Sequence, residues 1–546
     1  MSRTVPQNRV ADGFVAARMP PLAQLPQFRF DRPELQFGPQ LNLVEELFDK
    51  AVAKGFSNFP LLRSPKIVLT YADVRDRVDR IARVLVEDFG LRPGNRVLLR
   101  GGNSIGMALG WLAVVKAGLI AVATMPLLRA KELGDVIEKA QPSLALCDFM
   151  LIEELKLAQS QQSALHTIVP FNLMNEPGSL AVLASQQQAN FTAWPSAATD
   201  IAMMAFTSGT TGKPKAALHS HRDILAACEC WPRQVLKAGP GDMVIGSPPL
   251  AFTFGLGGLL IFPMWAGASV YFHNAPYTPE NMARVIHDVG ATICYTAPTF
   301  YRRMAPIIES LNAERGKPAL RVCVSAGENL PDTTRTLWRE ASGIEMTDGI
   351  GATEMFHIFI SSPPDEVRKG AIGKVVPGYT ARVVDDAGQE VPTGTVGELA
   401  VVGPTGCKYL DDPRQTAYVK NGWNFPGDAF SQDADGYFYY HARTDDMIVT
   451  AGYNVGAPEV EDALLGHPAV AECGVVGKPD AERGTIVKAF CVLKAGHAGD
   501  ALMVKTLQDH VKAAIAPYKY PREIEFVSAL PRTETGKLQR FRLKSA

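Results

Sequence analysis

One uncharged stretch decides whether this chain folds in a membrane or in water. Residues 247–272 carry no charged side chain, and the stretch is long enough to cross a bilayer as a helix. It also contains Pro248, Pro249 and Pro263 and four glycines. Proline and glycine interrupt helical hydrogen bonds, and a lipid-exposed helix has no water to satisfy the freed groups. We therefore predict a buried strand, loop and helix inside a large globular core, with no membrane partner.

The bulk composition narrows the choice further. A chain of 546 residues is too long for one core, so more than one domain is expected. Its 55 basic and 56 acidic side chains give a net charge of −1, which predicts no nucleic-acid partner. Of eight cysteines only Cys228 and Cys230 lie close together, which favours buried thiols over a metal site. The N-terminal residues do not resemble a secretory signal, so a cytoplasmic location is expected.

The alternation of short strands with amphipathic helices indicates the fold class. After an extended arm over residues 1–40, strands are predicted at 96–99, 167–169 and 292–295, and a helix at 106–117. Alternation of this kind is typical of layered α/β architecture. We expect this α/β architecture to form an N-terminal domain over residues 1–444.

The predicted pattern of strands, turns and helices changes twice in the remainder of the chain. Short strands separated by Asp/Gly turns predict a small β-rich subdomain at about 370–440. After residue 444 a compact unit begins, with helices predicted at 458–465 and 503–515 and strands at 472–476 and 488–493. The expected class is therefore α/β, with a large layered N-terminal domain, a β-rich subdomain and a small mobile α+β C-terminal domain over 445–546.

The strongest local signal follows an apolar strand at 201–206. Six small residues come first, four with a hydroxyl group and two glycines, and they are followed by Lys213 and Lys215. Such a loop can surround phosphate oxygens with backbone and hydroxyl donors while a lysine neutralises charge. It is not a Walker loop, because Pro214 follows Lys213 where that motif needs serine or threonine.

This loop resembles the signature of the adenylate-forming superfamily, which includes acyl- and aryl-CoA ligases, peptide-synthetase adenylation domains and luciferases. Four further segments resemble its motifs in family order: a nucleotide and magnesium segment at 348–354, a ribose segment at 422–428, a hinge segment at 443–448 and a catalytic-lysine loop at 531–537. The resemblance covers residues 45–546. It implies ATP, Mg²⁺ and coenzyme A as cofactors or substrates.

The resemblance also implies which residues hold ATP and AMP. They are Thr207, Ser208, Gly209, Thr210, Thr211, Gly212, Lys215, Gly327, Glu328, Asn329, Asp348, Gly349, Ile350, Gly351, Ala352, Asp428, Tyr440 and Arg443.

The residue types at three of the matched positions suit this chemistry. Glu354, next to Thr353, follows a glycine-rich turn, where a carboxylate can hold Mg²⁺. Asp428 follows a Pro-Gly turn and can accept both ribose hydroxyls, and Arg443 offers several donors to ribose or phosphate. Without the family context, a solvated glutamate, a turn-stabilising aspartate and a surface ion pair are the alternatives.

Near the C-terminus, the resemblance assigns Lys537 as the catalytic lysine of adenylation, together with Glu354 and Thr353. A carboxylate must attack the α-phosphorus, so two anions meet and positive charge is required. Asp445 matches the family's hinge position. After rotation about this hinge, Gly452 and Tyr453 are expected to line the channel for coenzyme A.

The acyl pocket is predicted from stretches that resemble benzoate- and 2-aminobenzoate-CoA ligases. The candidate lining residues are Phe254, Gly255, Leu256, Ala297, Ser325, Ala326, Gly327, Ile350 and His357. A flat aryl ring fits such an apolar, glycine-rich surface, and His357 can meet an ortho substituent or the carboxylate. The alternative for His357 is a core histidine bonded to a backbone carbonyl. The chain departs from many family members at Ile350, where an aromatic is usual, and at Phe254, where histidine is usual.

The predicted function is an aryl-CoA ligase that adenylates an aromatic acid and transfers it to coenzyme A. One alternative is an adenylation enzyme that loads a carrier protein, which the resemblance of the Gly452 segment to CoA ligases disfavours. Another is a non-catalytic nucleotide-binding protein, against which Glu354, Asp428, Arg443 and Lys537 argue together. The sequence leaves the oligomeric state open, with a homodimer as one alternative.

Overall fold

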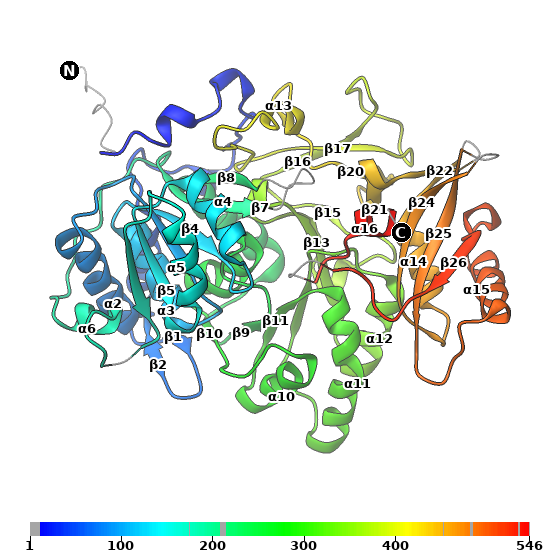
Figure 1. The fold of residues 1–546 in the computed structure, drawn as a ribbon, viewed down its shortest axis with the longest axis horizontal. Helices are drawn as coiled ribbons and strands as arrows, with labels where there is room; N and C mark the ends of the chain where they lie inside the picture. Colours follow the sequence, from blue (N-terminus) through cyan, green and yellow to red (C-terminus); the bar gives the residue numbers. More distant parts are fainter. Residues whose placement is uncertain are drawn as a thin grey trace.

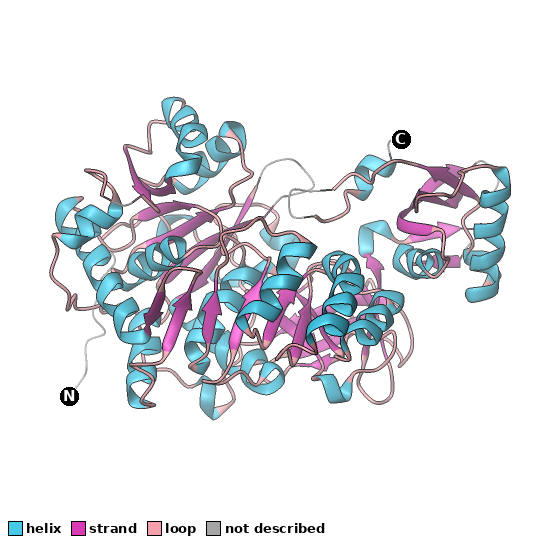
Figure 2. Cartoon of the chain, turned by 90° about the horizontal axis from the view of Figure 1, so that it is seen from below, coloured by secondary structure: helices cyan, strands magenta, loops and turns pink. Residues whose placement is uncertain are grey.

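The computed structural model describes residues 11–173, 175–207, 214–450, 453–480, 484–532 and 536–544, with backbone alone at 445, 449, 453, 454 and 484. Two large sheets with their helices form the bulk of the molecule, and a smaller C-terminal unit lies at one side, coloured orange to red in Figure 1. Figure 2 shows the same division from below. The predicted α/β class, with its β-rich part and smaller α+β unit, is confirmed.

The first sheet has six strands in the order β6-β5-β3-β4-β7-β8. Its strands are β3 (Arg96–Arg100), β4 (Ile120–Thr124), β5 (Leu144–Asp148), β6 (Thr167–Phe171), β7 (Ile201–Thr207) and β8 (Lys215–Ser220). All neighbours are parallel except β7 and β8. The main helices of this part are α1 (Leu43–Ala53), α2 (Tyr71–Arg83), α3 (Ile105–Lys116), α4 (Ala130–Ala140) and α5 (Ile152–Ser160). Every residue of β3 and β4 is buried, as expected for parallel strands covered on both faces.

The second sheet has nine strands in the order β15-β14-β13-β12-β11-β9-β10-β1-β2. Its strands are β1 (Pro60–Arg63), β2 (Val68–Thr70), β9 (Met243–Gly246), β10 (Ser269–Tyr271), β11 (Ile293–Thr296), β12 (Val322–Ser325), β13 (Met346–Gly351), β14 (Ile358–Ser361) and β15 (Lys374–Val375). The run from β13 to β9 is parallel, so the carboxyl ends of these four strands lie at one edge. Helices α10 (Pro279–Val289), α11 (Pro298–Arg315) and α12 (Asp332–Ser342) belong to this part, whereas α7 (His221–Glu229) contacts β8 of the first sheet.

The uncharged stretch is buried but is not arranged as predicted. It forms α8 (Thr253–Leu256), a π-helical turn (Gly257–Ile261) and α9 (Phe262–Ala266), and the strand β10 comes last rather than first. Residues 255–264 are all buried, so the stretch has no polar face for periodicity to reveal. Within the described part of the chain, no helix has both the length and the apolarity to cross a membrane.

The β-rich part and the C-terminal unit follow the prediction closely. The first contains β16 (Thr380–Val384), β17 (Gly397–Val402), β18 (Val419–Lys420), β19 (Trp423–Asn424), β20 (Asp428–Gln432) and β21 (Phe438–Arg443), with the short helix α13 (Gln415–Tyr418). The second contains β22 (Ile448–Thr450), β23 (Tyr453–Val455), α14 (Ala457–Leu465), β24 (Val470–Asp480), β25 (Gly484–Leu493), α15 (Ala501–Ala514), β26 (Glu523–Phe526) and α16 (Arg540–Lys544). The C-terminal unit has a separate apolar core that includes Val460, Val475 and Leu507.

The N-terminal arm and the cysteines agree with the sequence reading. The arm first contacts the first sheet, where Asp12 pairs with Arg96 at the start of β3. It then reaches the β-rich part, where Phe28 forms an isolated bridge with Gly403 and the Gln27 amide donates to the Gly422 carbonyl at 2.8 Å. All eight cysteines have free thiols and are buried.

Candidate active site

Several of the predicted site residues follow the carboxyl ends of adjacent parallel strands. Phe254 comes after β9, Ala297 after β11, Glu328 after β12 and Glu354 after β13. Because β9, β11, β12 and β13 are neighbours in one sheet, their following loops meet at the same edge. Ligand sites of open α/β sheets lie in this position. The fold therefore brings together residues that are about 100 positions apart in the sequence.

Glu354 is the centre of a compact charged cluster. Its carboxylate lies 3.4 Å from the ammonium of Lys215, and the Tyr409 hydroxyl donates to the same oxygen, Oε1. Lys215 in turn donates to the Tyr409 hydroxyl at 2.7 Å. Burial and the charge of Glu354 raise the pKa of Tyr409, so the phenol keeps its proton. Glu354 is only 7% exposed, which excludes the solvated-glutamate alternative.

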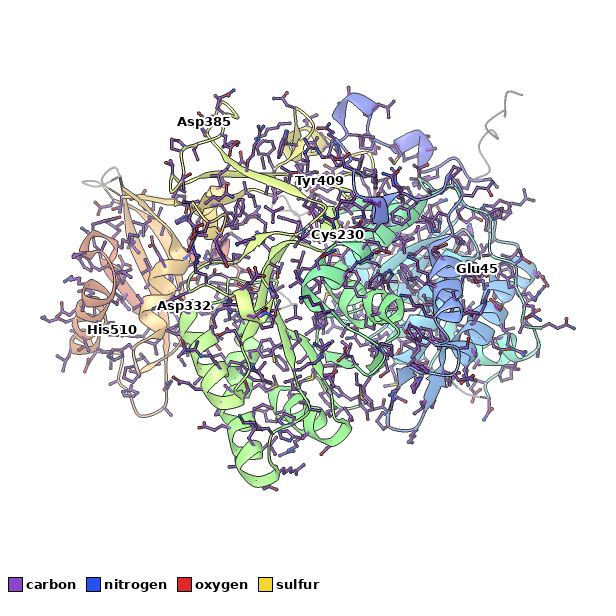
Figure 3. The ribbon with its side chains drawn as sticks, turned by 180° about the vertical axis from the view of Figure 1, so that it is seen from behind. Glu45, Cys230, Asp332, Asp385, Tyr409 and His510 are labelled. Carbon is purple, nitrogen blue, oxygen red and sulfur yellow. The ribbon has the colours of Figure 1, made fainter. Side chains whose placement is uncertain are left out.

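Tyr409 is a site residue that sequence reasoning missed. It lies in a loop between β17 and α13, held by a bridge to Ala217 of β8. Lys408, beside it, forms an ion pair with the buried Asp223. Figure 3 shows Tyr409 near the middle of the molecule, far from Glu45 and His510. No motif marks this position, because its importance depends on pairing between distant strands.

Asp428 and Arg443 form a second polar pair at the start of β20 and the end of β21. They are direct partners in the antiparallel register, and their side chains are 3.2 Å apart. Arg443 also donates to the Pro426 carbonyl at 2.7 Å. Gly427, at φ +81°, permits this approach, since a Cβ there would lie 2.8 Å from the guanidinium. Tyr440, also on β21, has a raised pKa because it is buried and faces Asp428.

Lys537 extends from the C-terminal unit into the same region. The charges that act on its ammonium group are Glu328, Arg443, Asp428 and Glu354, so it lies within reach of both polar pairs. Its Cε is 3.9 Å from the position that a Cβ on Gly327 would occupy. The side chain keeps contact with solvent, yet the protein around it displaces enough water to lower its pKa. Arg532 of the same loop lies 3.6 Å from Glu328.

Other predicted residues lie elsewhere or outside the described residues. Asp348 is buried within β13 and faces Arg335 at 4.0 Å, and burial raises its pKa to about 7. Gly349 lies against the Ile358 side chain, and Gly351 lies against the His357 carbonyl. A Cβ added at either glycine would lie 2.7 Å from that neighbour. The residues outside the described part are Ser208, Gly209, Thr210, Thr211, Gly212 and Gly452, together with the side chains of Asp445 and Tyr453.

Aromatic rings surround His357, where the sequence predicts the acyl pocket. The imidazole centroid lies 5.5 Å from Phe254, 5.3 Å from Trp231 and 4.6 Å from Phe262. Tyr295 packs edge-on against Phe254 at 5.7 Å. Trp231 and Tyr295 were not predicted, and neither belongs to a recognisable motif.

His357 is a buried imidazole without a strong partner. Burial lowers its pKa to about 3, and a polar contact with the Phe254 backbone offsets this only in part. Neither ring nitrogen makes a well-formed hydrogen bond to any described residue, and the same holds for the hydroxyls of Ser325 and Tyr295. Buried polar atoms without partners are uncommon, because each costs the free energy of its lost hydration. Burial therefore favours the neutral form of the imidazole.

The turn between Glu354 and His357 is strained. Phe356 has φ +70° and ψ −51°, a conformation that is unfavourable for a residue with a side chain. Its ring is fully buried and packs against Phe262 and His219. His219 also makes a 2.8 Å hydrogen bond to the Thr353 carbonyl. Strain of this kind persists only when the surroundings hold it, and here it turns Glu354 and His357 toward different parts of the site.

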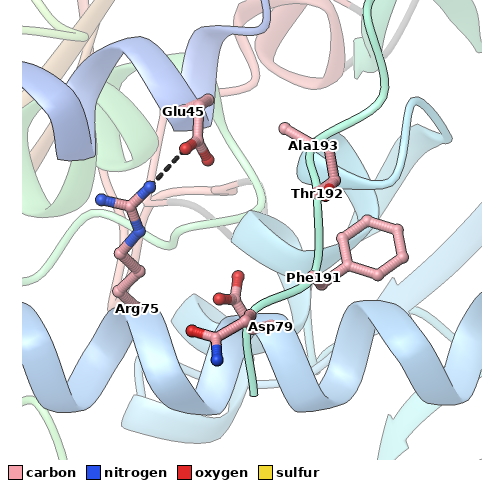
Figure 4. A pocket seen from close by; sticks show the side chains of 7 residues that line it. Glu45, Arg75, Asp79, Phe191, Thr192 and Ala193 are labelled. Atoms are coloured by element: carbon pink, nitrogen blue, oxygen red, sulfur yellow. Dashed lines mark hydrogen bonds and ion pairs between the residues drawn. The ribbon is translucent and has the colours of Figure 1, made fainter. Parts of the chain in front are cut away.

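A separate hollow of about 570 Å³ lies away from these residues. It is lined by Glu45, Arg75 and Asp79 and by residues 190–193 (Figure 4). Beside it the buried ammonium of Lys116 lies 2.5 Å from Asp79 and 2.8 Å from Glu45. The hollow contains none of the predicted site residues.

Comparison with protein families shows which family the chain belongs to. Residues 49–408 match the model of the AMP-binding enzyme family, and residues 459–537 match the AMP-binding enzyme C-terminal domain. The chain belongs to the AMP-binding enzyme family. The predicted membership of the adenylate-forming superfamily is thereby confirmed.

Individual relatives of this AMP-binding enzyme include characterised ligases. A benzoate–CoA ligase of Thauera aromatica is 35% identical, over 94% of this chain and 98% of the relative. The crystal structure of the anthranilate CoA ligase AuaEII with anthranoyl-AMP has a TM-score of 0.87 and 33% identity, over 94% of this chain and 98% of that one. A benzoate CoA ligase from Burkholderia xenovorans LB400 has a TM-score of 0.82 and 28% identity, over 92% of this chain and all of that one.

Proposed function

We propose that this AMP-binding enzyme is an aryl-CoA ligase whose preferred acid is a ring-substituted benzoate of the 2-aminobenzoate type. The observation that carries the substrate is the neutral His357, buried among Trp231, Phe254 and Phe262 without a well-formed hydrogen bond. An amino or hydroxyl group on the ring would give this imidazole a partner, whereas benzoate would leave it unsatisfied. The identity with benzoate- and anthranilate-CoA ligases supports the same class of acid.

In the first step, an acid oxygen attacks the α-phosphorus of ATP, and the bond from that phosphorus to pyrophosphate breaks. Lys537 neutralises the charge that builds between the carboxylate and the α-phosphate, and Lys215 faces the phosphates. Asp428 and Arg443 bind the ribose. The proximity of all four side chains to one strand edge supports these roles.

The residues present also suit a magnesium ion that arrives with the nucleotide. Mg²⁺ at phosphate sites commonly uses one or two protein carboxylates and takes its other ligands from phosphate and water. Glu354 supplies one carboxylate, oriented by Tyr409 and Lys215. When bound, the metal would offset the negative charge on the departing pyrophosphate.

In the second step, the sulfur of coenzyme A forms a thioester bond with the acyl carbon, and AMP leaves with the electrons of the acyl–phosphate bond. We assign Gly452 and Tyr453 to the path of coenzyme A. Asp445 is assigned to the hinge, about which the C-terminal unit rotates so that Lys537 leaves the site and these two residues enter it. The hinge segment joins the β-rich part to the C-terminal unit, which supports this assignment.

A substrate panel tests the proposal. Pyrophosphate release should be fastest with 2-aminobenzoate, slower with benzoate and negligible with long-chain fatty acids. The same reactions with coenzyme A, or with a carrier protein in its place, should give a thioester with coenzyme A alone. Preferential release with fatty acids would contradict the aryl pocket, and transfer to the carrier protein alone would contradict the CoA step.

A further inference from the structure

Helix α14 of the C-terminal unit docks on α11 and α12 through the ends of these helices. In Figure 1 the three helices lie next to one another, and Asp332, the first residue of α12, is labelled in Figure 3. Hydrogen bonds join α14 to the other two helices. They involve Asp462 and Leu465 of α14, Thr333 of α12 and Arg302 of α11.

Asp462 caps α12 from the other structural unit. The residue before α12 is Pro331, whose side chain has no oxygen to accept a hydrogen bond. Asp462 Oδ1 instead accepts from the Thr333 amide at 3.2 Å and from the Thr333 hydroxyl at 2.9 Å. The first amides of a helix have no partner within the helix, and a carboxylate at that end is favoured by the helix dipole.

Arg302 of α11 makes a matching contact at the C-terminal end of α14. Its guanidinium donates at 3.3 Å to the carbonyl of Leu465, the last residue of α14. Carbonyls at a helix C-terminus lack partners within the helix and attract positive charge. The side chain is half-buried, and Asp462 also attracts it electrostatically. Asp462 therefore gives a partner to an amide at the start of α12, and Arg302 gives a partner to a carbonyl at the end of α14.

We infer that Asp462 and Arg302 are positioning residues that hold the C-terminal unit in the arrangement in which Lys537 reaches Glu328, Asp428 and Glu354. The inference rests on the proposed two-step function. A contact present in only one of two arrangements shifts the equilibrium toward it by its own free energy. Because both contacts join the two units, they cannot persist if the unit rotates for thioester formation. They therefore favour adenylation and oppose the second step.

The test is Asp462→Ala, measured separately on the two half-reactions. ATP–pyrophosphate exchange should fall about fivefold, the change expected for a lost N-cap, while thioester formation from supplied acyl-AMP and coenzyme A should not fall. Asp462→Asn keeps an accepting oxygen and should retain most of the exchange activity. Asp509→Ala is the matched control, because Asp509 is an exposed helical aspartate of the same unit that, among the described residues, pairs with Lys505 and Lys512 alone. An equal loss in both half-reactions would overturn the inference.

A second measurement does not depend on the substrate. Hydrogen exchange of the backbone amides in residues 332–336, at the start of α12, should be faster in Asp462→Ala than in the wild type or in Asp509→Ala. Unchanged exchange there would show that Asp462 does not cap α12, and the inference would fail. If the wild type activates no benzoate, the proposed function fails. The half-reactions are then measured with whichever acid it activates, and hydrogen exchange still tests the cap.

Discussion

The phenolic oxygen of Tyr409 lies 2.7 Å from the ammonium nitrogen of Lys215 and also donates to Glu354. Three groups from β8, from the turn after β13 and from the loop after β17 thus share one hydrogen-bonded cluster. Tyr409 therefore orients Glu354, which the proposed mechanism assigns to magnesium, and Lys215, which it assigns to the phosphates. Contacts of this kind between distant segments can be tested one side chain at a time.

Tyr409→Phe should reduce adenylation about tenfold and leave the fold intact. The ring stays in place, and only the hydroxyl is lost, with a hydrogen bond to a charged group worth about 1.5–3 kcal/mol. ATP–pyrophosphate exchange and the melting temperature measure the two effects. Tyr418→Phe is the matched control, since Tyr418 packs 5.9 Å away and its hydroxyl has no hydrogen-bond partner among the described residues. Equal activity of the two variants would show that the Tyr409 hydroxyl is dispensable.

Lys537→Ala should lower acyl-AMP formation by about 10²–10³, the usual cost of removing a group that stabilises transition-state charge. Thioester formation from supplied acyl-AMP should persist, because that step does not use the lysine. Lys505→Ala, a change to an exposed lysine of the same unit, should affect neither step. Both half-reactions are measured by separation of AMP, acyl-AMP and thioester. A parallel loss of both steps would contradict the assigned role.

His357→Leu should change selectivity more than overall activity. Leucine preserves an apolar surface but cannot bind a ring substituent, so the ratio of kcat/KM for 2-aminobenzoate to that for benzoate should fall about tenfold, or about 1.4 kcal/mol. His357→Gln retains a donor and an acceptor and should restore part of the preference. A ratio that stays constant in both variants would show that the imidazole does not contact the substituent.

Gly427→Ala should weaken ATP binding by displacing Arg443. The new Cβ would lie 2.8 Å from the guanidinium, and φ at this position is +81°. Gly394→Ala is the control, because φ there is +80° but a Cβ would meet no atom within 4 Å. Both variants should lose about 1 kcal/mol of stability from backbone strain. Only Gly427→Ala should raise KM for ATP, about fivefold. Matching KM values in the two variants would rule out the displacement of Arg443.

Stability should fall as the solution becomes more acidic than about pH 6.5. Burial lowers the pKa of His221 to about 4, so between that value and the unfolded pKa the unfolded chain binds more protons than the folded chain. The stabilisation from His221 is complete above pH 6.5 and is lost as the pH falls toward 4, and His221 alone accounts for about 2 kcal/mol of the loss between pH 7 and pH 5. Denaturant midpoints at the two pH values measure this loss.

His221→Asn should make that pH dependence shallower. The asparagine oxygen can accept the Leu43 amide, which donates to His221 Nδ1 at 3.1 Å, but it does not titrate. His166→Asn, a change at an exposed histidine, should leave the pH dependence unaltered. An identical slope in the wild type and His221→Asn would mean that His221 does not contribute.

Residues that carry their chemistry within a short segment could be identified from the sequence. Glu354, Asp428, Arg443 and Lys537 each lie in a motif whose glycines and neighbours follow from local backbone geometry. Most strands and helices were also predictable, because a half-buried element leaves a period of 2 or 3.6 residues. Within the uncharged stretch a helix was expected but its bounds were not, since residues 255–264 are all buried and leave no such period.

The sequence by itself determined the family, the order of the nucleotide motifs and the location of the C-terminal unit with its lysine. Only the tertiary structure decided that Tyr409 joins Lys215 to Glu354, that Trp231 and Phe262 enclose His357, and that Asp462 caps α12. The physical reason is the range of the interactions. Turn and periodicity preferences act over a few residues, whereas these contacts join side chains that only strand order and helix docking bring together.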